Sequence, residues 1–130
     1  MSMENLEKGK KGEKLAKEYL LNKGYSIIAE NWRSGRSEID IIAKIENTLV
    51  FAEVKTRSTD YFGHPEESIG KQKKKMLQRG ANNFLEDYAF EVEVRFDVIS
   101  IIITNTQRKI YHIEDAFFMI EDDEGFRSVD

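Results

Sequence analysis

Two segments rich in apolar and β-branched residues, 36–45 and 48–57, lie on either side of the polar pair Glu46-Asn47. Side chains along a β-strand point to alternate faces, and both segments carry charged residues at every second position toward their outer ends. β-Branched residues favour strands, and a short polar pair between two such segments is typical of a tight turn. The pattern therefore predicts a β-hairpin at the centre of the chain.

The same pattern predicts two helices. Residues 4–23 carry apolar side chains at helical spacing, and Gly24 would end this helix. Residues 71–88 carry a second apolar stripe, interrupted by Gly80, where close packing on a sheet would explain the missing side chain. The remaining segments are a strand at 25–30, a polar loop at 31–36, strands at 91–103 and 109–113, a short apolar helical piece at 116–120 and an acidic, frayed tail at 121–130. We expect a single α/β domain, residues 1–120, with a mixed sheet of about five strands in the order α-β-β-β-α-β-β.

The turn at Glu46-Asn47 sets the register of the predicted hairpin. It places Asp40 opposite Glu53, and Glu38 opposite Lys55. Directly opposed Cβ atoms lie ~4.5–5.5 Å apart. Two ionised carboxylates at ~5 Å repel by roughly 3 kcal/mol at an effective dielectric of ~20. A cation between the two carboxylates would relieve this repulsion, and the candidates are the Lys55 ammonium and a divalent metal.

Metal-dependent phosphodiester hydrolysis would use this set of groups. A hard cation such as Mg²⁺ takes oxygen ligands, which Asp40, Glu53 and the Val54 carbonyl could supply. Lys55 emerges on the same strand face, and we assign it to orienting a water and stabilising charge on the phosphate. Glu13, at the flank of the first helix's apolar stripe, would point toward the sheet.

A simpler explanation exists for the same residues. Asp40, Glu53 and Lys55 could be the polar side of a half-solvated hairpin, with Glu38–Lys55 a cross-strand ion pair. Glu13 could be a solvated residue that suits the positive end of the helix dipole. The residue pattern alone does not decide between the two explanations.

The first turn of the second predicted helix is strongly basic. The helix dipole favours acidic residues at that end, so the lysines are unfavourable there. Residues that are unfavourable for the local structure tend to occur at functional sites. Phosphate contacts would supply the benefit. The candidate nucleic-acid-binding residues are Lys71, Lys73, Lys74 and Lys75, together with Arg33, Arg36 and Arg57.

Composition narrows the class of protein. The chain has 130 residues, of which 40% are hydrophobic, enough for one packed core. It has no cysteine, which excludes disulfides and thiolate zinc sites. It lacks the run of about 18 apolar residues that a membrane span needs and begins with charged residues, so we expect a cytoplasmic protein with no membrane partner.

The net charge of −4 is unevenly distributed. Residues 1–80 carry sixteen Lys and Arg against twelve Asp and Glu, whereas residues 81–130 carry four against twelve. Because a phosphate backbone meets local patches rather than the net charge, nucleic acid remains a candidate partner.

Several motifs occur in the order found in one known family. They are Gly12-Glu13-Lys14-Leu15-Ala16, Lys23-Gly24-Tyr25, Ser-Glu-Ile-Asp-Ile-Ile at 37–42, Val-Phe-Ala-Glu-Val-Lys-Thr-Arg at 50–57, Lys71-Gln72 and Arg95-Phe96-Asp97-Val98. With these motifs, residues 9–118 resemble the YraN-type family of uncharacterised bacterial proteins. That family is similar to the PD-(D/E)xK nuclease superfamily, and within it to archaeal Holliday junction resolvases. Two departures are Ile39 where a proline usually precedes the aspartate, and Ser37 in place of a glycine; neither removes a ligand.

The resemblance implies a restriction-endonuclease-like sheet core and a Mg²⁺- or Mn²⁺-dependent endonuclease acting on DNA, with branched DNA as one candidate substrate. It implies that Glu13 is the helix carboxylate, that Asp40 and Glu53 bind the metal, and that Lys55 is the active-site lysine. Gln72 would help to orient substrate or water. The alternative is a nucleic-acid-binding or adaptor protein that keeps the fold but has negligible turnover.

A homodimer is also expected, since the resolvases act as two-fold dimers. The apolar run at 99–103, with 116–120 after it, offers hydrophobic surface for such an interface.

Overall fold

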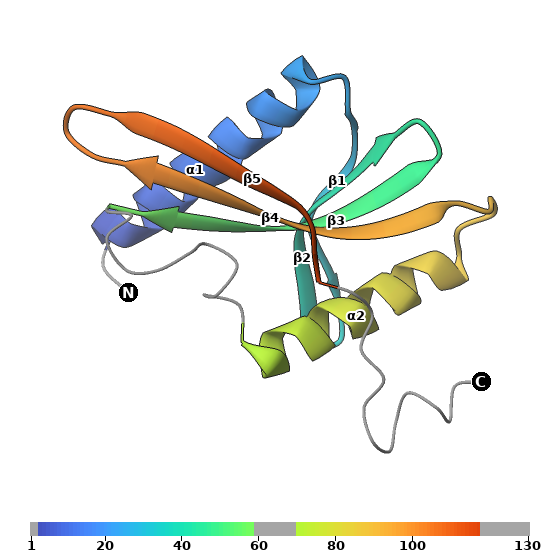
Figure 1. The fold of residues 1–130 in the computed structure, drawn as a ribbon. Coiled ribbons are helices and arrows are strands. Elements are labelled where there is room, and N and C mark those ends of the chain that lie inside the picture. The colour runs from blue at the N-terminus through green and yellow to red at the C-terminus, as the bar shows by residue number, and fades with distance from the viewer. Residues whose placement is uncertain (1–2, 59–69, 118–130) are drawn as a thin grey trace.

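The computed structural model describes residues 3–58 and 70–117, with side chains from residue 6 onward. Its helices and strands follow one another in the predicted order, which confirms the expected α/β class (Figure 1). They are α1 (Met3–Asn22), β1 (Ser26–Ser34), β2 (Ser37–Ile45), β3 (Thr48–Arg57), α2 (Lys71–Glu86), β4 (Glu93–Ile103) and β5 (Arg108–Phe117). Neither of these described helices is long and apolar enough to cross a membrane.

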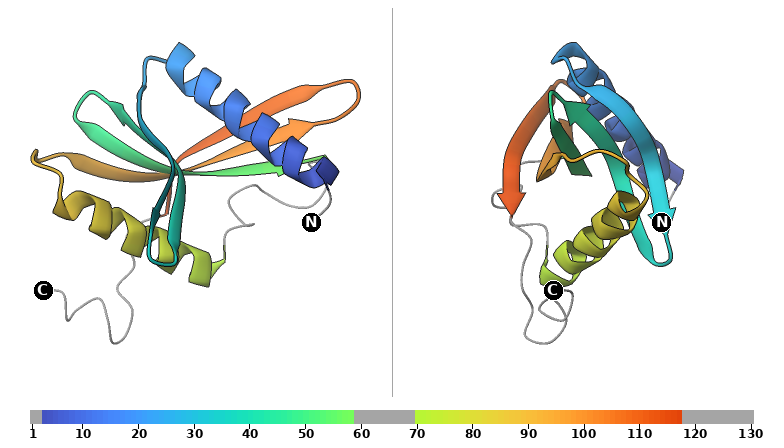
Figure 2. Two further views of the ribbon diagram at one scale, coloured as in Figure 1. Left: turned by 180° about the vertical axis from the view of Figure 1, so that it is seen from behind. Right: turned by 90° about the vertical axis from the view of Figure 1, so that its right-hand side faces the viewer.

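The five strands form one sheet in the order β1-β2-β3-β4-β5. Neighbouring strands are antiparallel except for β3 and β4, which are parallel because α2 crosses over between them. α1 packs on one face of the sheet, mainly against β3, and α2 packs on the other, mainly against β2 (Figure 2). The sheet is therefore the middle of three layers.

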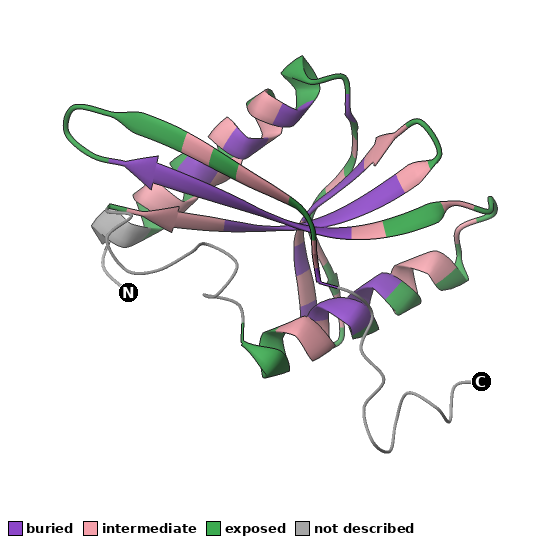
Figure 3. Ribbon diagram, viewed as in Figure 1, coloured by how far each residue is buried: buried purple, intermediate pink, exposed green. Residues whose placement is uncertain are grey.

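Each face of the sheet has its own hydrophobic core. The core under α1 consists of Ala16, Leu20, Tyr25, Ile41, Ala43, Val50, Ala52, Val54, Ile99, Ile101 and Ile103. The core under α2 consists of Ile39, Ile42, Leu49, Phe51, Leu77, Ala81, Phe96 and Phe117. Strand β3 contributes to both cores, and its residues 49–54 are all buried (Figure 3). Glu53 lies inside this buried run, where an ionised group is costly unless it is paired.

Gly80 brings α2 close to the sheet, as its position in the apolar stripe predicts. A Cβ at this position would lie 3.1 Å from the Cβ of Ser37 and 3.2 Å from the Cδ1 of Ile39. The Ser37 hydroxyl also donates a hydrogen bond of 3.0 Å to the Met76 carbonyl. These contacts fix α2 against the start of β2, beside the region where the candidate carboxylates lie.

Strand β1 is longer than the sequence pattern predicts. Residues 31–34, expected in a polar loop, continue the strand to the turn into β2. Trp32 explains the extension, because it pairs with Ile39 of β2 and its ring packs edge-on against Phe84 of α2, with centroids 5.4 Å apart.

The helical piece predicted at 116–120 is wrong for its first two residues, which belong to β5. Phe117 pairs with Phe96 of β4 and stacks on its ring, with centroids 5.0 Å apart, and this contact keeps the chain in the sheet. Residues 118–120 and the predicted tail at 121–130 lie outside the described residues. The apolar run at 99–103 is buried within the monomer, so it no longer argues for a dimer interface.

Candidate active site

The hairpin of β2 and β3 opens at the candidate carboxylates. Its pairs run from Ile45–Thr48 to Ile41–Ala52, in the register that the turn predicts. The pairing ends there, one pair before Asp40 and Glu53, so the predicted directly opposed pair does not form. The Oδ2 of Asp40 instead accepts a hydrogen bond of 2.8 Å from the Val54 backbone N–H. The Asp40 side chain thus takes the place of a ladder carbonyl where the two strands separate.

A change in the direction of β2 accounts for this opening. Strict alternation would put Ile39 and Ile41 on one face, but Ile39 packs under α2 and Ile41 under α1. Asp40 lies between them and its side chain is directed toward β3, as its bond to Val54 shows. On the neighbouring strand β1, Asn31 has a left-handed backbone with φ 49° and falls between the pairs Glu30–Ile41 and Trp32–Ile39. The two irregularities face each other across the β1–β2 ladder.

Glu53 is the most confined of the candidate ligands. Its side chain is 7% exposed, and its Oε2 lies 3.5 Å from the Nζ of Lys73. Its Oε1 is buried and has no hydrogen-bond partner among the described residues. Burial, followed by the nearby Asp40 carboxylate, raises the pKa of Glu53 to about 7, although Lys73 and Lys55 act in the opposite direction. A buried carboxylate oxygen without a partner is costly and is suited to a cation.

The other two carboxylates respond to the same surroundings. Burial raises the pKa of Asp40, and the Val54 N–H and the Lys73 charge only partly offset it. Burial, and then the Asp40 charge, raises the pKa of Glu13, which also has a hydrogen bond to Asn31. The Glu13 carboxylate is therefore half-buried on the sheet side of α1, near Asp40 and Asn31.

Glu13 reaches the site because α1 approaches β3 very closely at the preceding residue. Gly12 is buried, and a Cβ at this position would overlap with the Thr56 side chain of β3. Only a residue without a side chain allows this approach. The sequence pattern did not identify this role for Gly12.

Replacing Gly12 by alanine should therefore push α1 away from β3 and withdraw Glu13 from Asp40. We expect the overpacking to destabilise the fold by about 1–3 kcal/mol, in spite of the better helix propensity of alanine. Gly9→Ala is the matched control, because nothing lies within 4 Å of a Cβ at that position of the same helix. Urea denaturation of both variants tests the contact, and equal stabilities would contradict it.

The remaining candidate residues form two groups. Lys55 and Lys73 lie near Glu53, whereas Gln72 and Lys74 have other surroundings. Lys55 is half-buried on β3, near enough to Glu53 to lower its pKa, and Lys73 forms the ion pair with Glu53. Gln72 is exposed on the first turn of α2, and its side chain has no hydrogen bond to another described residue. Lys74 lies over the Phe117 ring, 5.5 Å from its centroid, so α2 presents its lysines to different neighbours.

The arginines do not all lie at the site. Arg33 is exposed and pairs with Glu38 at 3.4 Å, in place of the Glu38–Lys55 ion pair that the simpler explanation of the hairpin included. Arg36 is exposed in the turn between β1 and β2, and Arg57 ends β3. The described residues contain no group of three or more His, Asp or Glu side chains arranged around a metal position. Asp40 and Glu53 are the two carboxylates that influence each other most strongly here, and Glu13 is near enough to Asp40 to respond to its charge.

Comparison with known proteins identifies the family. Residues 12–101 match the model of the uncharacterised protein family UPF0102. The chain belongs to this family. The match confirms the YraN-type resemblance at the family level, and the matched segment contains Glu13, Asp40, Glu53, Lys55 and Gln72.

Similar UPF0102 proteins span nearly the whole chain. A protein of Christiangramia forsetii is 50% identical over 115 residues, which cover 88% of this chain and 97% of the relative. One of Thermodesulfovibrio yellowstonii is 48% identical over 116 residues, covering 89% and 100%. One of Chloroherpeton thalassium is 43% identical over 128 residues, covering 96% and 97%.

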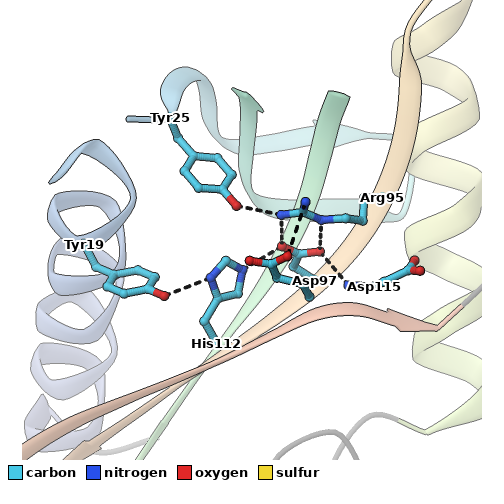
Figure 4. A network of polar contacts seen from close by, with 7 residues as sticks. Tyr19, Tyr25, Arg95, Asp97, His112 and Asp115 are labelled. Carbon is cyan, nitrogen blue, oxygen red and sulfur yellow. Dashed lines mark hydrogen bonds and ion pairs between the residues drawn. The ribbon is translucent and has the colours of Figure 1, made fainter. Parts of the chain in front are cut away.

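This UPF0102 protein has a second buried polar cluster, which the sequence motif Arg95-Phe96-Asp97-Val98 marks without giving it a role (Figure 4). The Asp97 carboxylate is fully buried and lies 2.6 Å from the Nε2 of His112. The Nε and Nη2 of Arg95 donate to it at 2.9 and 2.8 Å, and the Asp115 N–H donates at 3.0 Å. Arg95 also donates to the Tyr25 hydroxyl at 2.6 Å.

The surroundings of Asp97 differ from those of Glu53. Burial alone would raise the pKa of Asp97, but hydrogen bonds from His112, Arg95 and the Asp115 N–H lower it overall. The other ring nitrogen of His112 contacts the Tyr19 hydroxyl of α1 at 3.0 Å, so the cluster ties α1 to β4 and β5. Neither oxygen of Asp97 lacks a partner, which indicates a structural role.

Proposed function

We propose that this protein is a metal-dependent nuclease that hydrolyses phosphodiester bonds in DNA, with branched DNA as one candidate substrate. The observation that carries the proposal is the unpartnered Oε1 of Glu53, buried beside Asp40 where β2 and β3 separate. Both carboxylates have raised pKa values, so the metal-free site favours protons where a cation would replace them. The donor set suits Mg²⁺ or Mn²⁺, which bind through one or two carboxylates and retained waters.

The side chains around the carboxylates have distinct tasks in this proposal. Asp40 and Glu53 would hold the cation, with the Val54 carbonyl as a further oxygen. A divalent ion bound there would polarise the phosphoryl oxygens and lower the pKa of the attacking water. Lys55 stabilises negative charge that develops on the phosphate, and Glu13 lies on the α1 side of Asp40. Lys73 neutralises part of the Glu53 charge when no cation is present.

One observation favours a binding or adaptor protein without turnover. Lys73 already supplies Glu53 with a cation, and a permanent ion pair would leave little need for a metal. The two candidates predict different responses to divalent metal, because only a working site binds the ion in the folded state alone.

The first test combines cleavage with thermal stability at pH 8, where Glu53 is largely ionised without metal. Incubation with linear, nicked and four-way DNAs in Mg²⁺ and in Mn²⁺ should give cleavage that EDTA abolishes. The same ions should raise the melting temperature, since a ligand at 100 times its Kd stabilises by about 2.7 kcal/mol. DNA binding with neither metal stabilisation nor cleavage would favour the adaptor.

A further inference from the structure

A hollow of about 590 Å³ lies between α1 and the turn that joins β4 to β5. Its described lining consists of Lys11, Ile103, Thr104, Asn105, Thr106, Gln107 and Arg108. Two of these residues are cationic, four have neutral polar side chains, and none is acidic. In Figure 1 the first turns of α1, the end of β3 and the β4–β5 turn lie at the same end of the molecule.

The hollow is basic although the part of the chain that forms most of it is acidic. Residues 81–130 carry twelve acidic residues and only four basic ones, yet Arg108 of this segment faces the lysine-rich start of α1. Neither Lys11 nor Arg108 forms an ion pair with another described residue. Two cations that share a concave, polar surface repel each other, so the arrangement favours an anion between them.

The hollow lies further along β3 and β4 than the candidate active site, on the α1 side of the sheet, whereas the Glu53 side chain faces α2. Glu53 on β3 is paired with Val98 on β4, and Ile103 of the hollow follows five residues further along β4. At about 3.3 Å per residue the separation is roughly 17 Å. One strand of duplex DNA carries a phosphate about every 3.4 Å along the helix axis, so for a duplex whose axis follows β4 the separation corresponds to about five nucleotides.

We infer that this hollow binds a backbone phosphate of DNA, about five nucleotides from the bond held at Asp40 and Glu53. Lys11 and Arg108 contact the phosphate oxygens, and the Thr106 and Gln107 side chains supply further donors, whereas the Thr104 hydroxyl is used within the turn. The inference rests on the proposed function and adds to it a requirement for DNA that extends from the cut site toward the β4–β5 turn.

The test compares two double variants that remove equal charge. In EDTA, a labelled 20-base-pair duplex is titrated at several salt concentrations with Lys11→Gln/Arg108→Gln and with Lys23→Gln/Lys44→Gln. The control lysines lie at the end of α1 and near the β2–β3 turn. We expect the first variant to lower the slope of log K against log salt by roughly two units and to weaken binding about tenfold. The control should change the slope little, and circular dichroism melts should show both variants folded.

The outcomes separate this inference from the proposed function. Equal losses in both variants would show diffuse electrostatic attraction and would overturn the inference, as would an unchanged slope in the first. Wild-type protein that binds and cuts DNA, with an unaffected Lys11→Gln/Arg108→Gln variant, contradicts the hollow alone. Wild-type protein that fails to bind duplex DNA contradicts the hollow, and the proposed function is contradicted as well when nicked and four-way DNAs are neither bound nor cut. In a cleavage assay, the first variant should raise KM and leave kcat unchanged.

Discussion

Replacing Asp40 by asparagine should abolish Mg²⁺-dependent cleavage while the protein stays folded and still binds DNA. The asparagine side-chain oxygen can accept the Val54 N–H bond that Asp40 accepts now, so the end of the β2–β3 ladder is kept. The anionic metal ligand is lost. Loss of a group that only hydrogen-bonds to a metal ligand typically costs about 10–100-fold, so loss of a direct ligand should reduce cleavage by at least about 100-fold. The lost charge also repelled DNA, so binding in EDTA should hold or tighten.

Asp87→Asn is the control for this variant. It makes the same chemical change at an exposed position directly after α2. Cleavage in Mg²⁺, binding in EDTA and melting temperature are measured on both proteins. A hairpin with no metal function predicts a different result, in which relief of the Asp40–Glu53 repulsion stabilises the metal-free fold and activity does not change. If Asp40→Asn cuts DNA as fast as Asp87→Asn, the proposed metal site is wrong.

The sequence predicts the fold well because the signals that mark each helix and strand lie within a few neighbouring residues. Hydrophobic periodicity locates both helices and all five strands, and the polar pair Glu46-Asn47 sets the register of the pairs from Ile45–Thr48 to Ile41–Ala52. The errors occur where distant parts of the chain decide the local structure. Phe96 holds Phe117 in β5, and Phe84 of α2 holds Trp32 in β1.

The candidate site is predicted in part for the same reason. Spacing brings Asp40 and Glu53 near each other, but it cannot show that β2 turns between Ile39 and Ile41, since that depends on the left-handed Asn31 of the neighbouring strand. The place of Lys73 in the helix predicts phosphate contacts, and its ion pair with Glu53 appears only once α2 is packed on the sheet.

No local sequence pattern predicts the contacts of the Asp97 cluster. Tyr19 and His112 are 93 positions apart, and Tyr25 and Arg95 are 70 apart, so no spacing rule connects them. A charged pair within an otherwise apolar central strand was the available signal, because buried charges need partners. Its structural meaning follows from the number of hydrogen bonds that converge on one carboxylate.

Asp97→Asn should cause the largest loss of stability of any single charge-removing substitution considered for this protein. The change leaves Arg95 without its main partner, and its side chain is only 20% exposed. Breaking a buried ion pair on one side typically costs about 3–5 kcal/mol, a large part of the ~5–15 kcal/mol that stabilises a domain. Asp115→Asn is the matched control, because Asp115 contributes its backbone N–H and asparagine tolerates its left-handed φ of 56°.

The pH dependence of stability gives a second measure of the same cluster. The pKa of Asp97 is lower in the folded protein than the ~3.9 of an unfolded chain, so its contribution is complete above that pH and is lost as the pH falls through the folded value. Urea denaturation at pH 7 and at successively lower pH should therefore show the Asp97→Asn variant weaker at neutral pH but less sensitive to acid. Equal stability of Asp97→Asn and Asp115→Asn at pH 7 would mean that the buried carboxylate does not hold α1, β4 and β5 together.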